Sequence, residues 1–134
     1  MSCLPILTER IENFNKAFLM YQEAVKEFNT DKVLTHLALV QAYEICFELA
    51  WECLKDYLQE KGIEVSYPKD VIKEAFNKNT LKDGQLWVDM LQACNSTAHE
   101  YNIEKVSKYI IEISTIYFEE IKRFKNWLGE LSEQ

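Results

Sequence analysis

Apolar residues recur at steps of three and four along most of the chain, which is the spacing that gathers side chains on one face of an α-helix. In the first half of the chain this pattern predicts one helix over residues 5–28 and a second over residues 31–61. A short helix is predicted over residues 68–77, and longer helices over residues 86–101 and 103–131. On the buried faces of these helices we expect, among others, Val33, Leu37 and Phe76.

Signals for β-strands are nearly absent from the sequence. Residues 63–67 alternate between apolar and polar positions, but no second run could pair with them. Only three glycines and two prolines are present, so we expect few turns and long elements. We therefore predict an all-α protein, an up-and-down four-helix bundle with one extra short helix, as a single domain over residues 1–134.

The composition limits the partners that can be expected. The net charge is −7, so the field of the chain repels a polyanion, and we expect nucleotide or RNA binding either at a local site or through a complex with another protein. The first residues lack the basic and apolar regions of a leader, and no run of about 18 apolar residues predicts a membrane span. A cytoplasmic location without membrane contact is expected. The four cysteines form no Cys-x-x-Cys pair, which favours reduced, buried thiols.

One stretch, residues 86–101, changes along its length from an apolar helix into a group of polar side chains. As a helix it would place Gln92, Asn95 and His99 on one face, with Tyr101 on the neighbouring apolar face. The simplest interpretation is a helix end that holds a hydrogen-bonded histidine. The other interpretation is a binding or modification site built from Asn95, His99 and Tyr101.

A second polar series interrupts the apolar face of the second predicted helix. Gln41, Glu44 and Glu48 follow one another at steps of three and four, close to Trp51. Because buried carboxylates without partners are costly, these residues either border the apolar face and reach solvent or a partner chain, or they face the His99 group. Neither histidine has a glutamate three residues before it, as a metal site in a helical bundle would need, so we expect no metal and no other cofactor.

Three segments carry longer motifs. Residues 41–55 read Gln-Ala-Tyr-Glu-Ile-Cys-Phe-Glu-Leu-Ala-Trp-Glu-Cys-Leu-Lys, and residues 68–76 read Pro-Lys-Asp-Val-Ile-Lys-Glu-Ala-Phe. The third segment has the pattern Trp87-x-x-Met90, followed by Asn95-x-x-x-His99-x-Tyr101. Together they resemble the nucleotidyltransferase substrate-binding proteins, small all-helical relatives of the HEPN domains, over residues 7–128. That family has an arginine at the position of Cys94.

The resemblance implies a non-catalytic substrate-binding subunit that pairs with a separate, minimal nucleotidyltransferase. It also implies a homodimer. In related toxin–antitoxin pairs the helical chain is itself nucleotidylated, and the tyrosine that receives AMP corresponds to Tyr101. From the residues alone, Tyr101 fits a core aromatic with its hydroxyl at the surface equally well. The candidate binding or modification residues are Gln41, Glu44, Glu48, Trp51, Asn95, His99 and Tyr101.

Two other functions fit the same sequence. HEPN-type ribonucleases cleave RNA without a metal through an Arg-x4-His element, in which His99 would be the catalytic general base or acid. Cys94 weakens this hypothesis because a thiol cannot supply the positive charge of the arginine. A structural adaptor bundle would share every fold prediction and would differ only in having no transferase partner.

Overall fold

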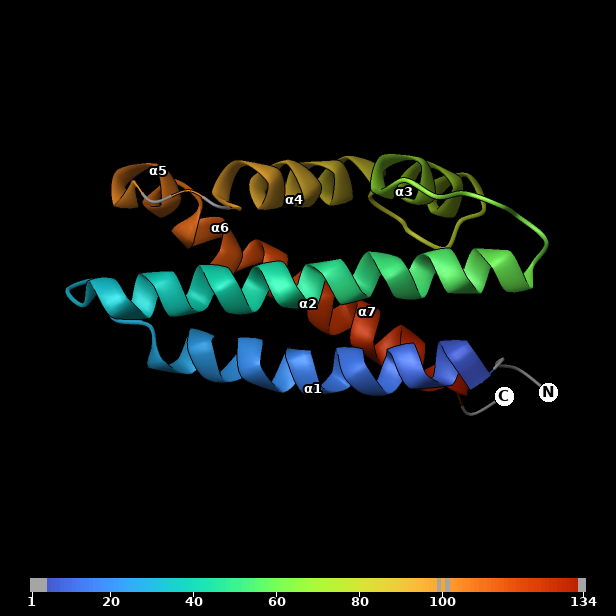
Figure 1. Ribbon diagram of the computed structural model, residues 1–134, viewed down its shortest axis with the longest axis horizontal. Helices are drawn as coiled ribbons and strands as arrows, with labels where there is room; N and C mark the ends of the chain where they lie inside the picture. The colour runs from blue at the N-terminus through green and yellow to red at the C-terminus, as the bar shows by residue number, and fades with distance from the viewer. Residues whose placement is uncertain (1–4, 99, 101, 133–134) are drawn as a thin grey trace.

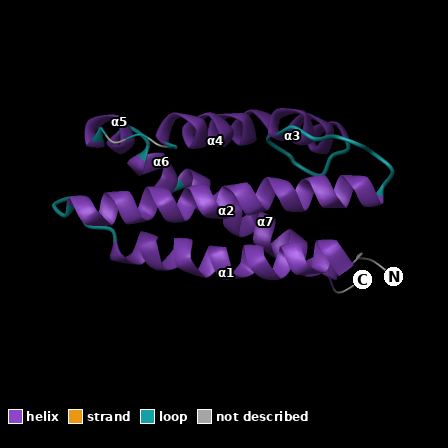
Figure 2. Ribbon diagram, in the orientation of Figure 1, coloured by secondary structure: helices purple, strands orange, loops and turns teal. Residues whose placement is uncertain are grey.

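The computed structural model describes residues 5–98, 100 and 102–132, and throughout this part of the chain the secondary structure is helical, without a strand. The prediction of an all-α bundle is confirmed (Figure 2). In chain order the helices are α1 (Pro5–Glu27), α2 (Val33–Glu60), α3 (Pro68–Asn77), α4 (Gly84–Thr97), α5 (Ile103–Ser107), α6 (Ile110–Ser114) and α7 (Ile116–Ser132).

Helix α2 lies at the centre of the bundle and contacts every other helix that the structure describes. Figure 1 shows α1 and α2 running antiparallel beside each other, with α4 on the opposite side of α2. The short helix α3 precedes α4, and α6 and α7 cross behind α2 toward α1 (Figure 1). The chain therefore makes four passes along the bundle, and α5, α6 and α7 together form the last pass.

Aromatic side chains fill the middle of the bundle. Trp87 of α4 is fully buried, and its ring centroid lies 5.6 Å from that of Phe47 and 5.2 Å from that of Phe124. Phe14 packs edge-on against Phe124 at 5.6 Å. The indole Nε1 of Trp87 donates a hydrogen bond of 2.9 Å to the carboxylate of Glu120, which gives the one polar atom of this buried ring a partner. Helices α2, α4 and α7 thus meet at Trp87, and α1 joins this cluster through the contact of Phe14 with Phe124.

The last predicted helix, residues 103–131, is divided into three parts. Its apolar face is buried as expected, but the backbone breaks at residues 108–109 and at Thr115, whose φ of −124° and ψ of −85° are not helical. The hydroxyls of Ser114 and Thr115 both donate to the carbonyl of Ile111, and such side-chain bonds compete with the helical ladder. The prediction of one continuous helix was wrong. The spacing of apolar residues shows which side chains are buried, but it does not show whether the backbone stays helical between them.

Helix α4 begins and ends earlier than the predicted range of residues 86–101. Asp83 caps its first turn by accepting a hydrogen bond of 3.0 Å from the backbone N–H of Leu86. The helix ends at Thr97, and Ala98 is extended, with a ψ of 128°. The side chain of Asn102 then caps α5 by accepting from the N–H of Glu104. Ala98, Glu100 and Asn102 therefore lie outside the helix that we predicted for this stretch, while residues 99 and 101 lie outside the described residues.

Helices α2 and α3 end with the same backbone conformation. After α2, Gly62 has a φ of 83°, and the N–H of Ile63 reaches back to the carbonyl of Leu58. After α3, Asn79 has a φ of 62°, and the N–H of Thr80 reaches the carbonyl of Ala75. Gly62 was predicted to end the second helix, and it does so because glycine adopts this left-handed conformation without steric cost.

By length and composition, α2 is also apolar enough to cross a membrane, contrary to what we read from the sequence. A core helix of a bundle passes the same test, and α2 contributes a buried face to the core. Part of its apolar surface is nevertheless exposed: Val33 and Leu37, which we expected to be buried, both face solvent. The absence of membrane contact stays a prediction.

Candidate functional site

A polar cleft lies where the first half of α2 faces the end of α4 and the start of α5. Its volume is about 440 Å³. Two of the predicted site residues, Gln41 and Glu44, line it from α2. Among the residues that the structure describes, its lining is Leu37, Val40, Gln41, Glu44, Thr97, Ala98, Glu100 and Val106. We call this hollow the polar cleft.

Glu44 and Thr97 join the two walls of the polar cleft. The Thr97 hydroxyl lies 2.6 Å from Oε2 of Glu44 and 2.9 Å from the carbonyl oxygen of Ala93. Because a hydroxyl carries one hydrogen, it donates to one of these oxygens at a time, and the shorter contact favours the charged carboxylate. Thr97 is buried, whereas Glu44 is half-buried. Sequence analysis missed Thr97, since a threonine at a helix end is an ordinary feature.

His99 and Tyr101 lie outside the residues that the structure describes, so their predicted roles stay predictions. Of the described residues next to them in the chain, Ala98 and Glu100 both line the polar cleft. The carboxylate of Glu100 accepts a hydrogen bond of 2.9 Å from the backbone N–H of Asn102. Gln41 and Glu44 therefore share a cleft with Ala98 and Glu100, and their contact with the His99 group stays a prediction.

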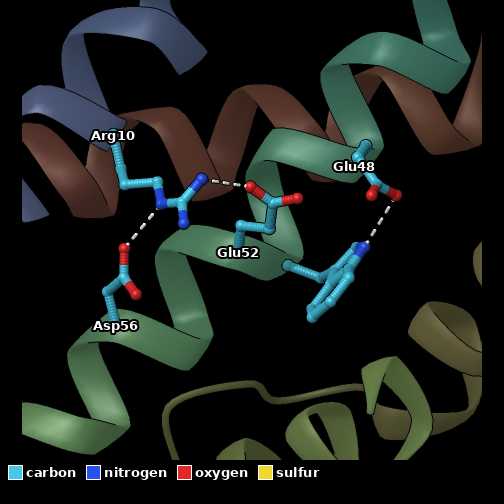
Figure 3. A network of polar contacts seen from close by, with 5 residues as sticks. Arg10, Glu48, Glu52 and Asp56 are labelled. Atoms are coloured by element: carbon cyan, nitrogen blue, oxygen red, sulfur yellow. Dashed lines mark hydrogen bonds and ion pairs between the residues drawn. The ribbon is translucent and has the colours of Figure 1, made fainter. Parts of the chain in front are cut away.

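Glu48 and Trp51 belong to a different set of contacts, farther along α2. The indole Nε1 of Trp51 donates a hydrogen bond of 3.0 Å to Oε2 of Glu48, within the same helix. Neither residue lines the polar cleft. Figure 3 shows Glu48 beside the ion pairs that Arg10 forms with α2. The predicted site residues of α2 therefore divide into two groups.

Arg10 of α1 connects to two acidic residues of α2 (Figure 3). Its Nε donates to Oδ2 of Asp56 at 2.8 Å, and its Nη1 pairs with the carboxylate of Glu52. Burial raises the pKa of Glu52, Arg10 opposes that shift, and the nearby Glu48 and Asp56 add to it. Sequence analysis missed this network, although Glu48, Glu52 and Asp56 recur at the four-residue spacing of one helix face.

Cys94 stands where the related family has an arginine, and its surroundings keep the thiol in its neutral form. Burial raises its pKa to about 12, and the carboxylates of Glu44 and Glu48 add to the shift, while a hydrogen bond with the Tyr43 hydroxyl opposes it. Tyr43 is itself fully buried and donates a hydrogen bond of 2.6 Å to the carbonyl of Met90. Position 94 therefore carries no charge near neutral pH.

Asn95 is exposed on α4, and its side chain has no hydrogen-bond partner among the residues described. It does not line the polar cleft, so the structure does not join it to Gln41 and Glu44. In the described part of the chain, no three His, Cys, Asp or Glu side chains gather as a metal site would. What the described residues of the polar cleft offer chemically is two carboxylates, a hydroxyl and an amide at the edge of an apolar wall.

Comparison with known proteins identifies the family of this chain. The sequence profile of a family described as nucleotidyltransferase substrate binding protein like matches residues 9–130. A crystal structure of a protein from Thermus thermophilus superposes with a TM-score of 0.77 at 26% sequence identity, and the match covers 88% of this chain and 98% of that chain. No curated protein sequence matches this chain at a comparable level of significance.

Proposed function

This chain belongs to the nucleotidyltransferase substrate binding protein-like family, and we propose that it is the non-catalytic subunit of a pair whose other member is a minimal nucleotidyltransferase. The family match over residues 9–130 carries the proposal, since it spans nearly the whole bundle. The sequence supports a non-catalytic role for this chain. It has three glycines and no glycine-rich loop, which is the usual element that binds the phosphates of a nucleoside triphosphate during transfer. The transferase would supply the metal and the nucleotide.

We further propose that Tyr101 accepts the transferred nucleotide. The phenolic oxygen of Tyr101 would attack the α-phosphorus of ATP, forming a new P–O bond while the bond to the bridging oxygen breaks and pyrophosphate leaves. The phenolic proton would pass to a base of the transferase or to water. In support of this proposal, the chain neighbours Ala98 and Glu100 line the polar cleft, where a docking transferase would find Glu44 and Gln41 as polar contacts.

The experiment is an intact-mass measurement of this chain after incubation with its transferase, ATP and Mg²⁺. We expect added mass in AMP-sized steps, absent in Tyr101→Phe and retained in Tyr67→Phe, a matched control at an exposed tyrosine on another part of the bundle. A stable complex without added mass would keep the pairing and overturn the acceptor role. Failure to form a complex at all would overturn the pairing and favour an adaptor bundle.

The surroundings of Cys94 count against the ribonuclease alternative. A HEPN-type ribonuclease needs a fixed positive charge to neutralise the developing charge at phosphate. Here the thiol is held neutral, with the carboxylates Glu44 and Glu48 as its charged neighbours. RNA cleavage that disappears in His99→Ala would reverse this ranking.

We also propose that the chain forms a homodimer through α1 and α2. A groove of about 380 Å³ between these helices is lined by Ala17, Met20, Leu37, Ala38, Gln41, Ala42 and Ile45. Three of its lining residues are alanines, and two of the others, Met20 and Ile45, are 68% and 49% exposed. Apolar patches of this kind mark interaction sites on soluble proteins.

A second copy is the occupant that the groove itself suggests. Large exposed apolar side chains beside small ones would let two copies pack against each other across a two-fold axis, as the interface of a homodimer requires. The groove also shares Leu37 and Gln41 with the polar cleft, so a second copy seated there would approach the cleft of its partner. Light scattering at micromolar concentration should give the mass of a dimer, and a monomer mass would contradict the proposal.

A further inference from the structure

A second hollow lies away from the polar cleft, between α3 and the first turns of α4. Its volume is about 550 Å³. It shares no lining residue with the polar cleft or with the groove between α1 and α2. Its lining is Lys69, Ile72, Lys73, Phe76, Lys82, Asp83, Gly84, Gln85 and Val88. We call it the lysine hollow.

Three lysines surround the lysine hollow in a protein whose net charge is −7. Lys69 and Lys73 lie one helical turn apart on α3, and Lys82 comes from the loop before α4. None of the three forms an ion pair within the part of the chain that the structure describes. Asp83 is the one acidic residue in the lining, and it is engaged as the cap of α4. The hollow therefore carries a net charge of about +2, since three lysines face one aspartate.

The charges of α3 are sorted between its two sides. Asp70 and Glu74 line a separate hollow with Glu64, and neither lines the lysine hollow. Lys73 lies at the border and belongs to both. The positive charge is thus concentrated on the side of α3 that faces the start of α4, although the helix as a whole is nearly balanced.

The wall of the lysine hollow is apolar and includes an exposed aromatic ring. Phe76, which we expected to be buried, is 47% exposed, and Ile72 and Val88 lie beside it in the lining. The ring rests on Gly84: a Cβ added there would lie 2.9 Å from Cγ of Phe76. Position 84 therefore needs a glycine for close packing, and this contact holds the ring at the hollow.

We propose that the lysine hollow binds a nucleotide, with the base against the Phe76 side and the phosphate among Lys69, Lys73 and Lys82. Its size falls within the range of small-molecule sites, about 300–1,000 Å³, and an apolar wall with a few convergent charges is their usual composition. Lysine ammonium groups bind phosphate as point charges, and an aromatic face stacks on any base. A free nucleotide and the nucleotide of an RNA strand share this chemistry.

This inference goes beyond the proposed pairing with a transferase and can be tested on the isolated chain. Isothermal titration at low salt would use AMP and ATP, with adenosine and inorganic phosphate as partial ligands. We expect AMP and ATP to bind with a Kd below about 1 mM, ATP more tightly because it carries more charge, and both partial ligands at least about tenfold more weakly. A short RNA oligonucleotide, titrated in parallel, identifies the source: tighter binding than AMP indicates a strand, and weaker binding a free nucleotide.

The deciding variant is Lys69→Gln with Lys73→Gln, because both side chains are exposed and the fold does not depend on them. We expect AMP binding to weaken by about tenfold or more. The matched control, Lys16→Gln with Lys26→Gln, makes the same change in net charge on exposed positions of α1 and should leave binding within about twofold.

Three results would overturn the inference: no binding of either nucleotide, equal weakening by the variant and its control, or binding of adenosine as tight as that of AMP. Each leaves the transferase pairing untouched, because no transferase is present in the titration. Conversely, a chain that binds AMP at the lysine hollow and never gains mass beside a transferase would overturn only the acceptor role of Tyr101.

Discussion

The hydroxyl of Thr97 lies 2.6 Å from a carboxylate oxygen of Glu44, so the last turn of α4 is joined to the middle of α2 at the edge of the polar cleft. Thr97→Val keeps the shape of the side chain and removes this bond, leaving Glu44 half-buried without its donor. We expect the free energy of unfolding to fall by about 1–3 kcal/mol, as measured by urea unfolding.

Thr97→Ser is the matched control, because it keeps the hydroxyl and loses only a methyl group. It should cost clearly less than Thr97→Val. Equal losses in the two variants would mean that packing of the methyl group, and not the bond to Glu44, holds the end of α4 in place.

The two arginines of the chain allow a comparison between an ion network that joins two helices and an ion pair within one helix. Arg10, with a side chain 37% exposed, is shared by Glu52 and Asp56 across two helices. Arg123, 69% exposed, pairs with the buried Glu120 on its own helix, and Glu120 keeps its hydrogen bond from Trp87 when Arg123 is removed. We expect Arg10→Ala to destabilise by about 1–3 kcal/mol and Arg123→Ala by less than about 1 kcal/mol. Thermal or urea unfolding of both variants, side by side, measures the difference. The reverse order would show that the α1–α2 network contributes little.

The thiols of Cys53 and Cys94 should make the stability of the protein depend on pH in the alkaline range. Burial raises the pKa of Cys53 and that of Cys94 to about 12, from an ordinary value of 9.0. Above about pH 9 the unfolded chain has lost these protons while the folded chain still holds them, so stability falls as pH rises toward 12. We expect Cys94→Ser to make this alkaline decline shallower in urea unfolding measured between pH 7 and about pH 10.5.

The same raised pKa values predict slow thiol chemistry in the folded protein. In a Cys3→Ser background, a disulfide reagent at pH 8 should modify Cys46, Cys53 and Cys94 only as fast as the chain unfolds, because the thiolate is the reacting form. The urea-unfolded chain serves as the positive control. Rapid modification of any of these thiols in the folded protein would contradict the prediction.

The groove between α1 and α2 gives a test of the homodimer that leaves the core intact. Ile45→Lys places a charge on the wall of the groove and should shift the mass seen by light scattering from dimer to monomer. Ile111→Lys is the control, since Ile111 is 68% exposed and does not line the groove. Loss of the dimer in both variants, or in neither, would place the interface elsewhere.

The sequence was sufficient for the helices that have clear ends. Pro68 in the first turn and the sharp loss of apolar spacing after Asn77 bound α3 as predicted, and Gly62 closes α2. The breaks before and after α6 could not be predicted, because the buried positions on either side keep the spacing of one helix. The packing of α6 and α7 against α2 decides whether the backbone at Thr115 stays helical or breaks, with the Thr115 hydroxyl bonded to the carbonyl of Ile111. The spacing of apolar residues in the sequence carries no information on this packing.

The candidate site was predictable in part for a similar reason. Gln41 and Glu44 stood out as polar residues on an apolar face, and the structure brings them to the neighbours of His99 and Tyr101. Glu48 has the same spacing and the same charge, yet it bonds to Trp51 on its own helix. Arg10, far away in sequence, draws Glu52 and Asp56 toward α1, and no local pattern could have indicated that partner.

The placement of Cys94 between Tyr43, Glu44 and Glu48 has an evolutionary consequence. Both cysteine codons become arginine codons when their first base changes, so the two residues at this position are separated by a single point mutation. The two carboxylates that oppose the ionisation of a thiol would favour a guanidinium in its place. The electrostatic surroundings of position 94 therefore suit a positively charged arginine side chain as well as a neutral thiol.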